Sequence, residues 1–87
     1  MYILTQDNNN LINMNQVASI YIQKVYRQYN QPDTWWEIRA MYSALSNEDV
    51  LWDTIAKFND DIDCQVAFNN LVNDILTLDK KFISFKK

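Results

Sequence analysis

Apolar and polar residues alternate through short stretches of the first 58 residues. The segments "YILT" (residues 2–5) and "LINMN" (residues 11–15) are two such runs, and the turn-forming cluster "QDNNN" (residues 6–10) separates them. Neighbouring side chains of a strand point to opposite faces of a sheet, so this alternation is typical of half-buried strands. We therefore predict that the two runs form a first β-hairpin.

Three longer alternating runs follow, and a turn separates each from the next. Pro32 fixes its own φ angle and lacks a backbone N–H, which favours a turn between the first two of these runs. The cluster "SNED" favours a second turn before the third run. The predicted strands cover residues 17–29, 34–42 and 50–58, and the turns cover residues 30–33 and 46–49.

The hydrophobic period changes at Asp60. Beyond it, apolar residues recur at intervals of three and four, which is typical of an amphipathic helix. Asn59, Asp60 and Asp61 can cap the start of this helix, which we place at about residues 60–80. Residues 82–85 are interpreted as a short strand or a tail. The apolar positions of the helix are Cys64, Ala67, Phe68, Leu71, Val72, Ile75, Leu76 and Leu78.

The order of these elements predicts the fold class. Strands at about residues 2–58 precede a single helix, without the alternation of strands and helices that builds a parallel sheet. We therefore predict one α+β domain over residues 1–87, an antiparallel β-meander of four to five strands with one C-terminal amphipathic helix packed on one face. Cys64 lies on the apolar stripe of this helix, where we interpret it as a small core residue.

Composition narrows the classes of function. Basic residues number 8 and acidic residues 11, so the net charge of −3 gives no case for direct binding of nucleic acid. The single cysteine excludes an internal disulfide. No apolar run approaches the roughly 18 residues of a membrane span, and the N-terminus lacks the features of a signal peptide. We expect a cytoplasmic protein that does not act at a membrane.

The chain contains neither histidine nor glycine. Without histidine, the usual imidazole base and metal ligand are missing. Without glycine, neither a P-loop nor a dinucleotide-binding fingerprint can be formed. We therefore expect no enzyme, no cofactor and no metal site. Turns that need a positive φ angle must use Asn or Asp, the next most tolerant residues.

The adjacent tryptophans Trp35 and Trp36 must point to opposite faces of their strand. Trp36 shares its parity with Ile38 and Ala40, so we place this more apolar face under the helix. Trp35 then lies on the other face, where aromatic and arginine side chains together have the composition of a binding hot spot. The candidate partner-binding residues are Trp35, Arg39, Tyr21, Glu37 and Arg27.

Three uses of Trp35 stay open at this point. Its ring could cover loop residues or pair across strands, form a homodimer contact, or bind a partner protein. A second candidate is an acidic zone, which is explained either as helix capping and a solvated turn or as a surface that docks onto a basic groove. The acidic residues are Asp60, Asp61, Asp63, Glu48 and Asp49.

Several stretches also resemble a known group of proteins. "YILTQDNNNLINMNQVASIYI", then "WEIRA", "IAKF" and a helix carrying Ala67, are similar to small uncharacterised proteins of low-GC Gram-positive bacteria and their phages. Those proteins end a strand with a Gly-x-Tyr pair, where this chain has Ala56 and Phe58. The resemblance implies a meander followed by one helix and a phage or mobile-element setting, and it carries over no active site.

These observations together predict a small non-enzymatic binding protein of phage or mobile-element origin. It is expected to occlude a functional surface of a host protein, such as a nucleic-acid-binding defence effector, in the manner of an anti-CRISPR or other anti-defence inhibitor. One alternative is a protein that sequesters a nucleotide signal, for which only Arg27 and Arg39 supply positive charge on the predicted face. The other is a structural or assembly protein that self-associates through its aromatic sheet face.

Overall fold

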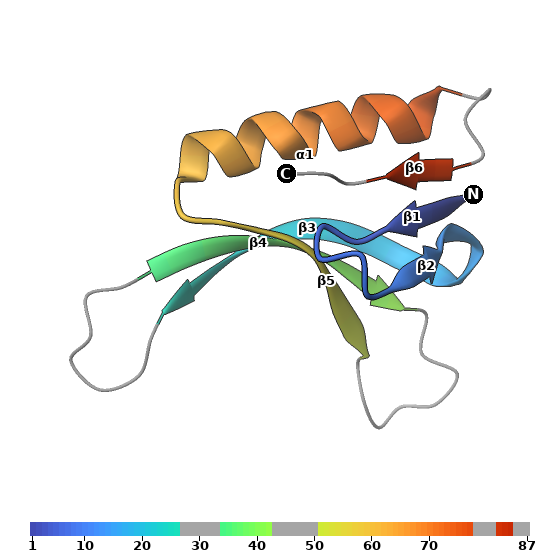
Figure 1. Ribbon diagram of the computed structural model, residues 1–87, viewed down its shortest axis with the longest axis horizontal. Coiled ribbons are helices and arrows are strands. Elements are labelled where there is room, and N and C mark those ends of the chain that lie inside the picture. Colours follow the sequence, from blue (N-terminus) through green and yellow to red (C-terminus); the bar gives the residue numbers. More distant parts are fainter. Residues whose placement is uncertain (27–33, 43–50, 78–81, 85–87) are drawn as a thin grey trace.

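The computed structural model describes residues 1–26, 34–42, 51–77 and 82–84. In this part of the chain, six strands form two three-stranded sheets, and one α-helix lies beside them (Figure 1). The first sheet has the order β2-β1-β6 and consists of β2 (Leu11–Asn13), β1 (Tyr2–Leu4) and β6 (Phe82–Ser84). The second has the order β3-β4-β5 and consists of β3 (Val17–Tyr26), β4 (Thr34–Tyr42) and β5 (Trp52–Phe58). A short 3₁₀ helix (Met14–Gln16) precedes β3, and α1 (Asp61–Leu76) follows β5.

The predicted α+β class, with an antiparallel meander and one C-terminal helix, is confirmed, but the strands are grouped differently from the prediction. The first hairpin does not extend the meander, because β1 also pairs in parallel with β6. This register aligns Ile3 with both Ile12 and Ile83, and all three side chains are buried. These three isoleucines form a row through which the small sheet contributes to the hydrophobic core.

The turn between β1 and β2 is formed without glycine. Asn8 adopts a positive φ angle of 62°, as expected for a chain in which Asn must replace Gly. Asp7 accepts hydrogen bonds from the Thr5 hydroxyl at 2.6 Å and from the Asn9 N–H at 3.0 Å. The backbone N–H of the buried Thr5 also donates a hydrogen bond to the carbonyl of Asn10 at 3.0 Å. Polar side chains thus replace glycine in fixing this turn.

A β-bulge interrupts β5. Its register against β4 shifts between the pairs Ile38–Ala56 and Arg39–Thr54, which leaves Ile55 as an extra residue. The backbone carbonyl of Ile55 accepts a hydrogen bond from the Gln6 N–H at 2.8 Å. The bulge therefore ties the turn after β1 to the edge of the second sheet.

The helix begins and packs as its sequence pattern predicts. Asp60 is the N-cap and accepts a hydrogen bond from the Asp63 N–H at 3.0 Å. Cys64 and Leu71 are fully buried, in one cluster with Ile38 and Ala40. The helix ends at Leu76, four residues before the predicted end, and residues 78–81 lie outside the described part.

The prediction that Leu76 belongs to the buried stripe is wrong, because this side chain is 72% exposed. It lies twelve residues after Cys64, which is about a third of a turn away from the buried line at 3.6 residues per turn. Within the described residues, no helix combines the length and apolarity needed to cross a membrane.

Leu71→Ala tests whether α1 supplies the core. We expect the free energy of unfolding to fall by about 2–5 kcal/mol, through lost transfer energy and the cavity left behind. Asn70→Ala is the control, since Asn70 is exposed on the same helix and should stay within about 0.5 kcal/mol of wild type. Urea unfolding of both variants measures the difference, and equal midpoints contradict the assignment of the core.

Candidate partner-binding face

One face of the sheet β3-β4-β5 is covered and the other is not. Ile3 and Leu71 share a buried cluster with Ile38, so the first sheet and α1 both lie on the side of β4 that carries Ile38. No described element lies on the opposite side (Figure 1). We call this uncovered surface the open face and define it by Tyr21, Gln23, Val25, Trp35, Glu37, Arg39, Trp52, Thr54 and Lys57.

Strand register brings the predicted residues together on this face. Tyr21 pairs with Arg39, and Val25 pairs with Trp35, so each pair shares one face of the sheet. Glu37 lies between Trp35 and Arg39 on β4. The predicted grouping of Tyr21, Trp35, Glu37 and Arg39 on one face is therefore confirmed. Arg27, predicted to extend it, lies outside the described residues.

Three open-face residues of β5 were not predicted. Lys57 pairs with Glu37, whereas Thr54 pairs with Arg39 and Trp52 with Met41. Strict alternation along β5 would place Lys57 on the face opposite to Thr54 and Trp52. The bulge at Ile55 reverses the alternation and brings all three to the open face. The adjacent apolar pair Ile55–Ala56 is the signal in the sequence that could have revealed it.

Glu37 is the centre of a hydrogen-bond network on the open face. Its Oε2 accepts from the indole N–H of Trp35 at 2.7 Å. Its Oε1 accepts from Arg39 Nε at 2.9 Å and from the Thr54 hydroxyl at 3.0 Å. The Arg39 and Glu37 side chains are only 16% and 12% exposed, so most of this ion pair is buried away from water. The network spans β4 and β5 and holds these side chains in one arrangement.

Two cations stack on the aromatic rings around Glu37. The Arg39 guanidinium lies 3.8 Å from the centroid of the Trp52 ring. The Lys57 ammonium lies 4.5 Å from the Trp35 ring. Each contact is attractive because the face of an aromatic ring carries negative charge density. Trp35 therefore pairs across strands, one of the uses left open by the sequence, while part of its surface stays accessible.

Glu37 acts as a fixed negative charge. Partial burial by itself raises the pKa of Glu37, but hydrogen bonds from its three donors and the charge of Arg39 outweigh this effect, and the pKa lies below its ordinary value of 4.5. Both oxygens already accept hydrogen bonds. This arrangement suits an ordered charged surface better than a proton-transferring group.

Trp36 lies on the covered face, as its parity predicts, and it packs half-buried against the core. The Lys24 ammonium lies 5.6 Å from its ring and 5.1 Å from that of Tyr26. Further along the same face, the Tyr42 hydroxyl donates to Asp53 at 2.6 Å. Burial and the Asp53 carboxylate raise the pKa of Tyr42 to about 12.

Cys64 is fully buried, and burial raises the pKa of its thiol. The interpretation of Cys64 as a core residue is confirmed.

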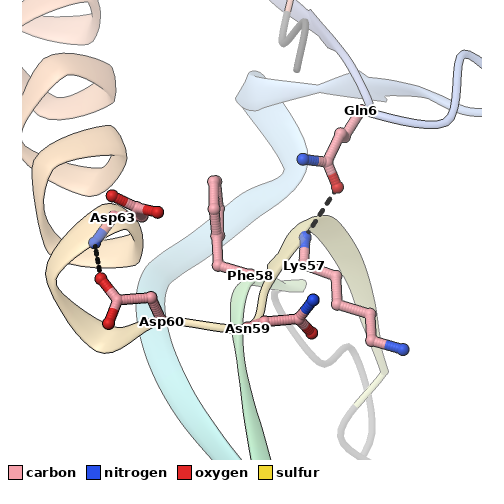
Figure 2. A pocket seen from close by; sticks show the side chains of 6 residues that line it. All are labelled: Gln6, Lys57, Phe58, Asn59, Asp60 and Asp63. Carbon is pink, nitrogen blue, oxygen red and sulfur yellow. Dashed lines mark hydrogen bonds between the residues drawn. The ribbon is translucent and has the colours of Figure 1, made fainter.

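Asp60, Asp61 and Asp63 of the predicted acidic zone lie at the start of α1, and Asp60 and Asp63 line a surface hollow of about 400 Å³ (Figure 2). All three are exposed, and Asp60 also caps the helix. Lys57 lines the hollow too, but its ammonium points away from Asp60 and Asp63 toward the Trp35 ring. The hollow is lined by Gln6, Lys57, Phe58, Asn59, Asp60 and Asp63. Glu48 and Asp49 of the predicted acidic zone lie outside the described residues.

Fold and site together define a small α+β protein with an uncovered sheet face of aromatic and charged side chains. In residues 1–26, 34–42, 51–77 and 82–84, no group of three or more His, Cys, Asp or Glu residues could hold a metal ion. No protein-family model, curated protein or solved structure matches the chain.

Glu37→Gln tests the network. At neutral pH we expect the free energy of unfolding to fall by about 1–2 kcal/mol, because a neutral amide cannot accept hydrogen bonds on both sides, and solvent screens part of the loss. Folding lowers the pKa of Glu37, so its ionised form stabilises the protein above about pH 4.5 and this contribution disappears as the pH falls further. The difference between wild type and variant should therefore shrink below pH 4.5.

Urea unfolding at a series of pH values measures this effect. Trp35→Phe is the companion variant, because it removes one donor to Glu37 and keeps an aromatic ring beneath Lys57. It should lose less stability than Glu37→Gln. If the free energy of unfolding of Glu37→Gln stays below that of wild type by the same amount from neutral to acidic pH, the ionised carboxylate does not stabilise the network as we infer.

Proposed function

We propose that this chain is a non-enzymatic binding protein that uses its open face to occlude a functional surface of a host protein. In this proposal it comes from a phage or mobile element, acts in the cytoplasm of the bacterial host, and inhibits a defence protein. Its sequence resemblance to proteins of low-GC Gram-positive bacteria and their phages supports the setting. The observation that carries the binding function is the ordered aromatic and charged network on an uncovered sheet face.

Order on the open face favours binding for a thermodynamic reason. Immobilising a flexible side chain in an interface costs about 0.5–1.5 kcal/mol. Arg39 and Lys57 are already held by rings, and Glu37 is held by its donors. A partner that docks here meets side chains whose conformational entropy was lost on folding. Trp, Tyr and Arg are also the residues that most often dominate binding energy.

The same network favours a protein partner over a nucleotide signal. A phosphate group needs cations that are free to converge on it. Arg39 is already paired with Glu37 and stacked on Trp52, and Lys57 lies on Trp35. A bound phosphate would have to compete with a carboxylate 2.9 Å from the guanidinium. An aromatic surface whose arginine is already compensated by a carboxylate fits a protein surface better.

The test is capture of a host protein by purified wild type and variants. Trp52→Ala removes an aromatic ring of the open face that is 45% exposed. Tyr2→Ala is the matched control, because Tyr2 is an aromatic residue of the first sheet with the same 45% exposure. Lysate of a low-GC Gram-positive bacterium supplies the partner, which mass spectrometry identifies. We expect Trp52→Ala to weaken binding of that partner about 30-fold, as loss of an aromatic anchor does, and Tyr2→Ala to bind like wild type.

Trp35→Ala provides a second variant of the open face, with melting measured in parallel to show that it is folded. It should also lose binding. Undiminished binding by both Trp52→Ala and Trp35→Ala contradicts the proposal. Assembly of the wild type through the open face, abolished by the same two variants in the absence of a host protein, would favour the structural alternative.

A further inference from the structure

The outward side of α1 carries a regular stripe of side chains that no described element covers (Figure 1). Its members follow one another at intervals of four, three, four and three residues, the spacing with which one helix packs against another. All of them are exposed, on the side of α1 away from the buried Cys64 and Leu71. We call this set the outer stripe; it consists of Ile62, Val66, Asn69, Asn73 and Leu76.

The outer stripe differs from an ordinary solvent-facing helix surface because it lacks charge. The outward side of a surface helix usually carries charged side chains, yet no charged residue stands between Asp63 and Asp74. Ile62, Val66 and Leu76 are apolar and are 68%, 54% and 72% exposed. This composition and spacing are typical of the contact line of a two-helix coiled coil, in which apolar residues recur every 3.5 residues and an Asn sets the register.

Two asparagines decide what kind of helix can cover the outer stripe. Asn69 and Asn73 lie at its centre, with apolar residues on either side. A wholly apolar helix would take both side-chain amides away from water and leave them without hydrogen-bond partners, which is costly. The occupant must therefore present amide groups opposite these two positions and apolar groups beyond them.

We propose that the occupant is α1 of a second copy, packed antiparallel so that the two helices form a homodimer. Read in either direction, the stripe from Val66 to Leu76 gives the order apolar, amide, amide, apolar, with spacings of three, four and three residues. A twofold axis level with residue 71 therefore places Val66 opposite Leu76 of the second copy, and Asn69 opposite Asn73 of the second copy. Every layer pairs like with like, which is the condition that a self-matching interface must meet.

A hydrogen bond within α1 already orients the first of these amides. Gln65 Nε2 donates to Asn69 Oδ1 at 3.0 Å. In the dimer, Asn69 Nδ2 donates to Asn73 Oδ1 of the second copy. The Nδ2 group of that Asn73 donates in return to Asn69 Oδ1, which has a second lone pair. The two central layers are thereby satisfied without water.

The acidic start of α1 favours the antiparallel arrangement over a parallel one. A parallel pair would place Asp60, Asp61 and Asp63 of both copies side by side and align the two helix dipoles. The antiparallel pair instead separates Asp61 of one copy from Asp61 of the other by about 30 Å along the helices. The outer stripe lies on the covered side of the sheet, so the open face stays free and the inference is independent of the proposed function.

Sedimentation from micromolar to millimolar concentration tests the dimer, which we expect to be weak because its four layers span only about 15 Å of helix. Val66→Glu places a carboxylate in two of these layers and should raise the dimer dissociation constant at least about tenfold. Leu11→Glu is the matched control, because Leu11 lies in the first sheet and is 52% exposed, against 54% for Val66. It should dimerise like wild type. A wild type that stays monomeric to millimolar concentration, or a dimer that Val66→Glu leaves unchanged, overturns the proposal.

Charged substitutions at the two asparagines test the register itself. Asn69→Asp and Asn73→Lys each place a charge opposite a neutral amide, and each should raise the dissociation constant at least about tenfold. The double variant Asn69→Asp/Asn73→Lys pairs a carboxylate with an ammonium in both central layers of an antiparallel dimer, and its dissociation constant should return to within about threefold of wild type. A parallel dimer would pair like charges instead. A double variant that dimerises no better than the single variants contradicts the proposed register.

Discussion

The arrangement of this protein depends on one extra residue, Ile55 in the bulge of β5. An uninterrupted strand alternates its faces, and β5 could not then bury both Ile55 and Ala56 while presenting Trp52 and Lys57 on the open face. With the bulge, Ile55 and Ala56 are 1% and 2% exposed. The backbone carbonyl of Ile55 also accepts a hydrogen bond from the Gln6 N–H, which attaches the turn after β1 to the second sheet. Core, sheet junction and open face therefore share one backbone irregularity.

The open face that results carries one negative side chain, Glu37, and two positive ones, Arg39 and Lys57. Arg39 and Glu37 form an ion pair, the Arg39 guanidinium stacks on the Trp52 ring, and the exposed Lys57 lies over the Trp35 ring. A partly buried ion pair often contributes little net stability, because removing the charges from water costs nearly as much as their attraction returns. What such a network does supply is a single arrangement of its side chains. That property links the network to the proposed binding role.

Much of the second sheet could be predicted from the sequence, because alternation and turn residues mark strands directly. The parity of Trp35 and Trp36 assigned both faces of β4 correctly, and the Asp60 cap was evident from its position before the helical pattern. The pairing of β6 with β1 could not be predicted, since it joins three-residue strands that are distant in the chain. Trp52 and Lys57 were missed because a bulge changes parity without changing composition. The proposed origin and partner stay predictions.

The most direct test of this account is the set of nuclear Overhauser contacts made by Trp52 and Lys57 in solution. We expect the Trp52 ring to contact the Arg39 side chain and the Lys57 side chain to contact the Trp35 ring, both on the open face. The backbone amide hydrogen of Gln6 should exchange slowly with solvent, because it is hydrogen-bonded to the carbonyl of Ile55 in the bulge. Contacts that place Trp52 and Lys57 on opposite faces of β5 would show that the strand alternates without a bulge, and would contradict the account.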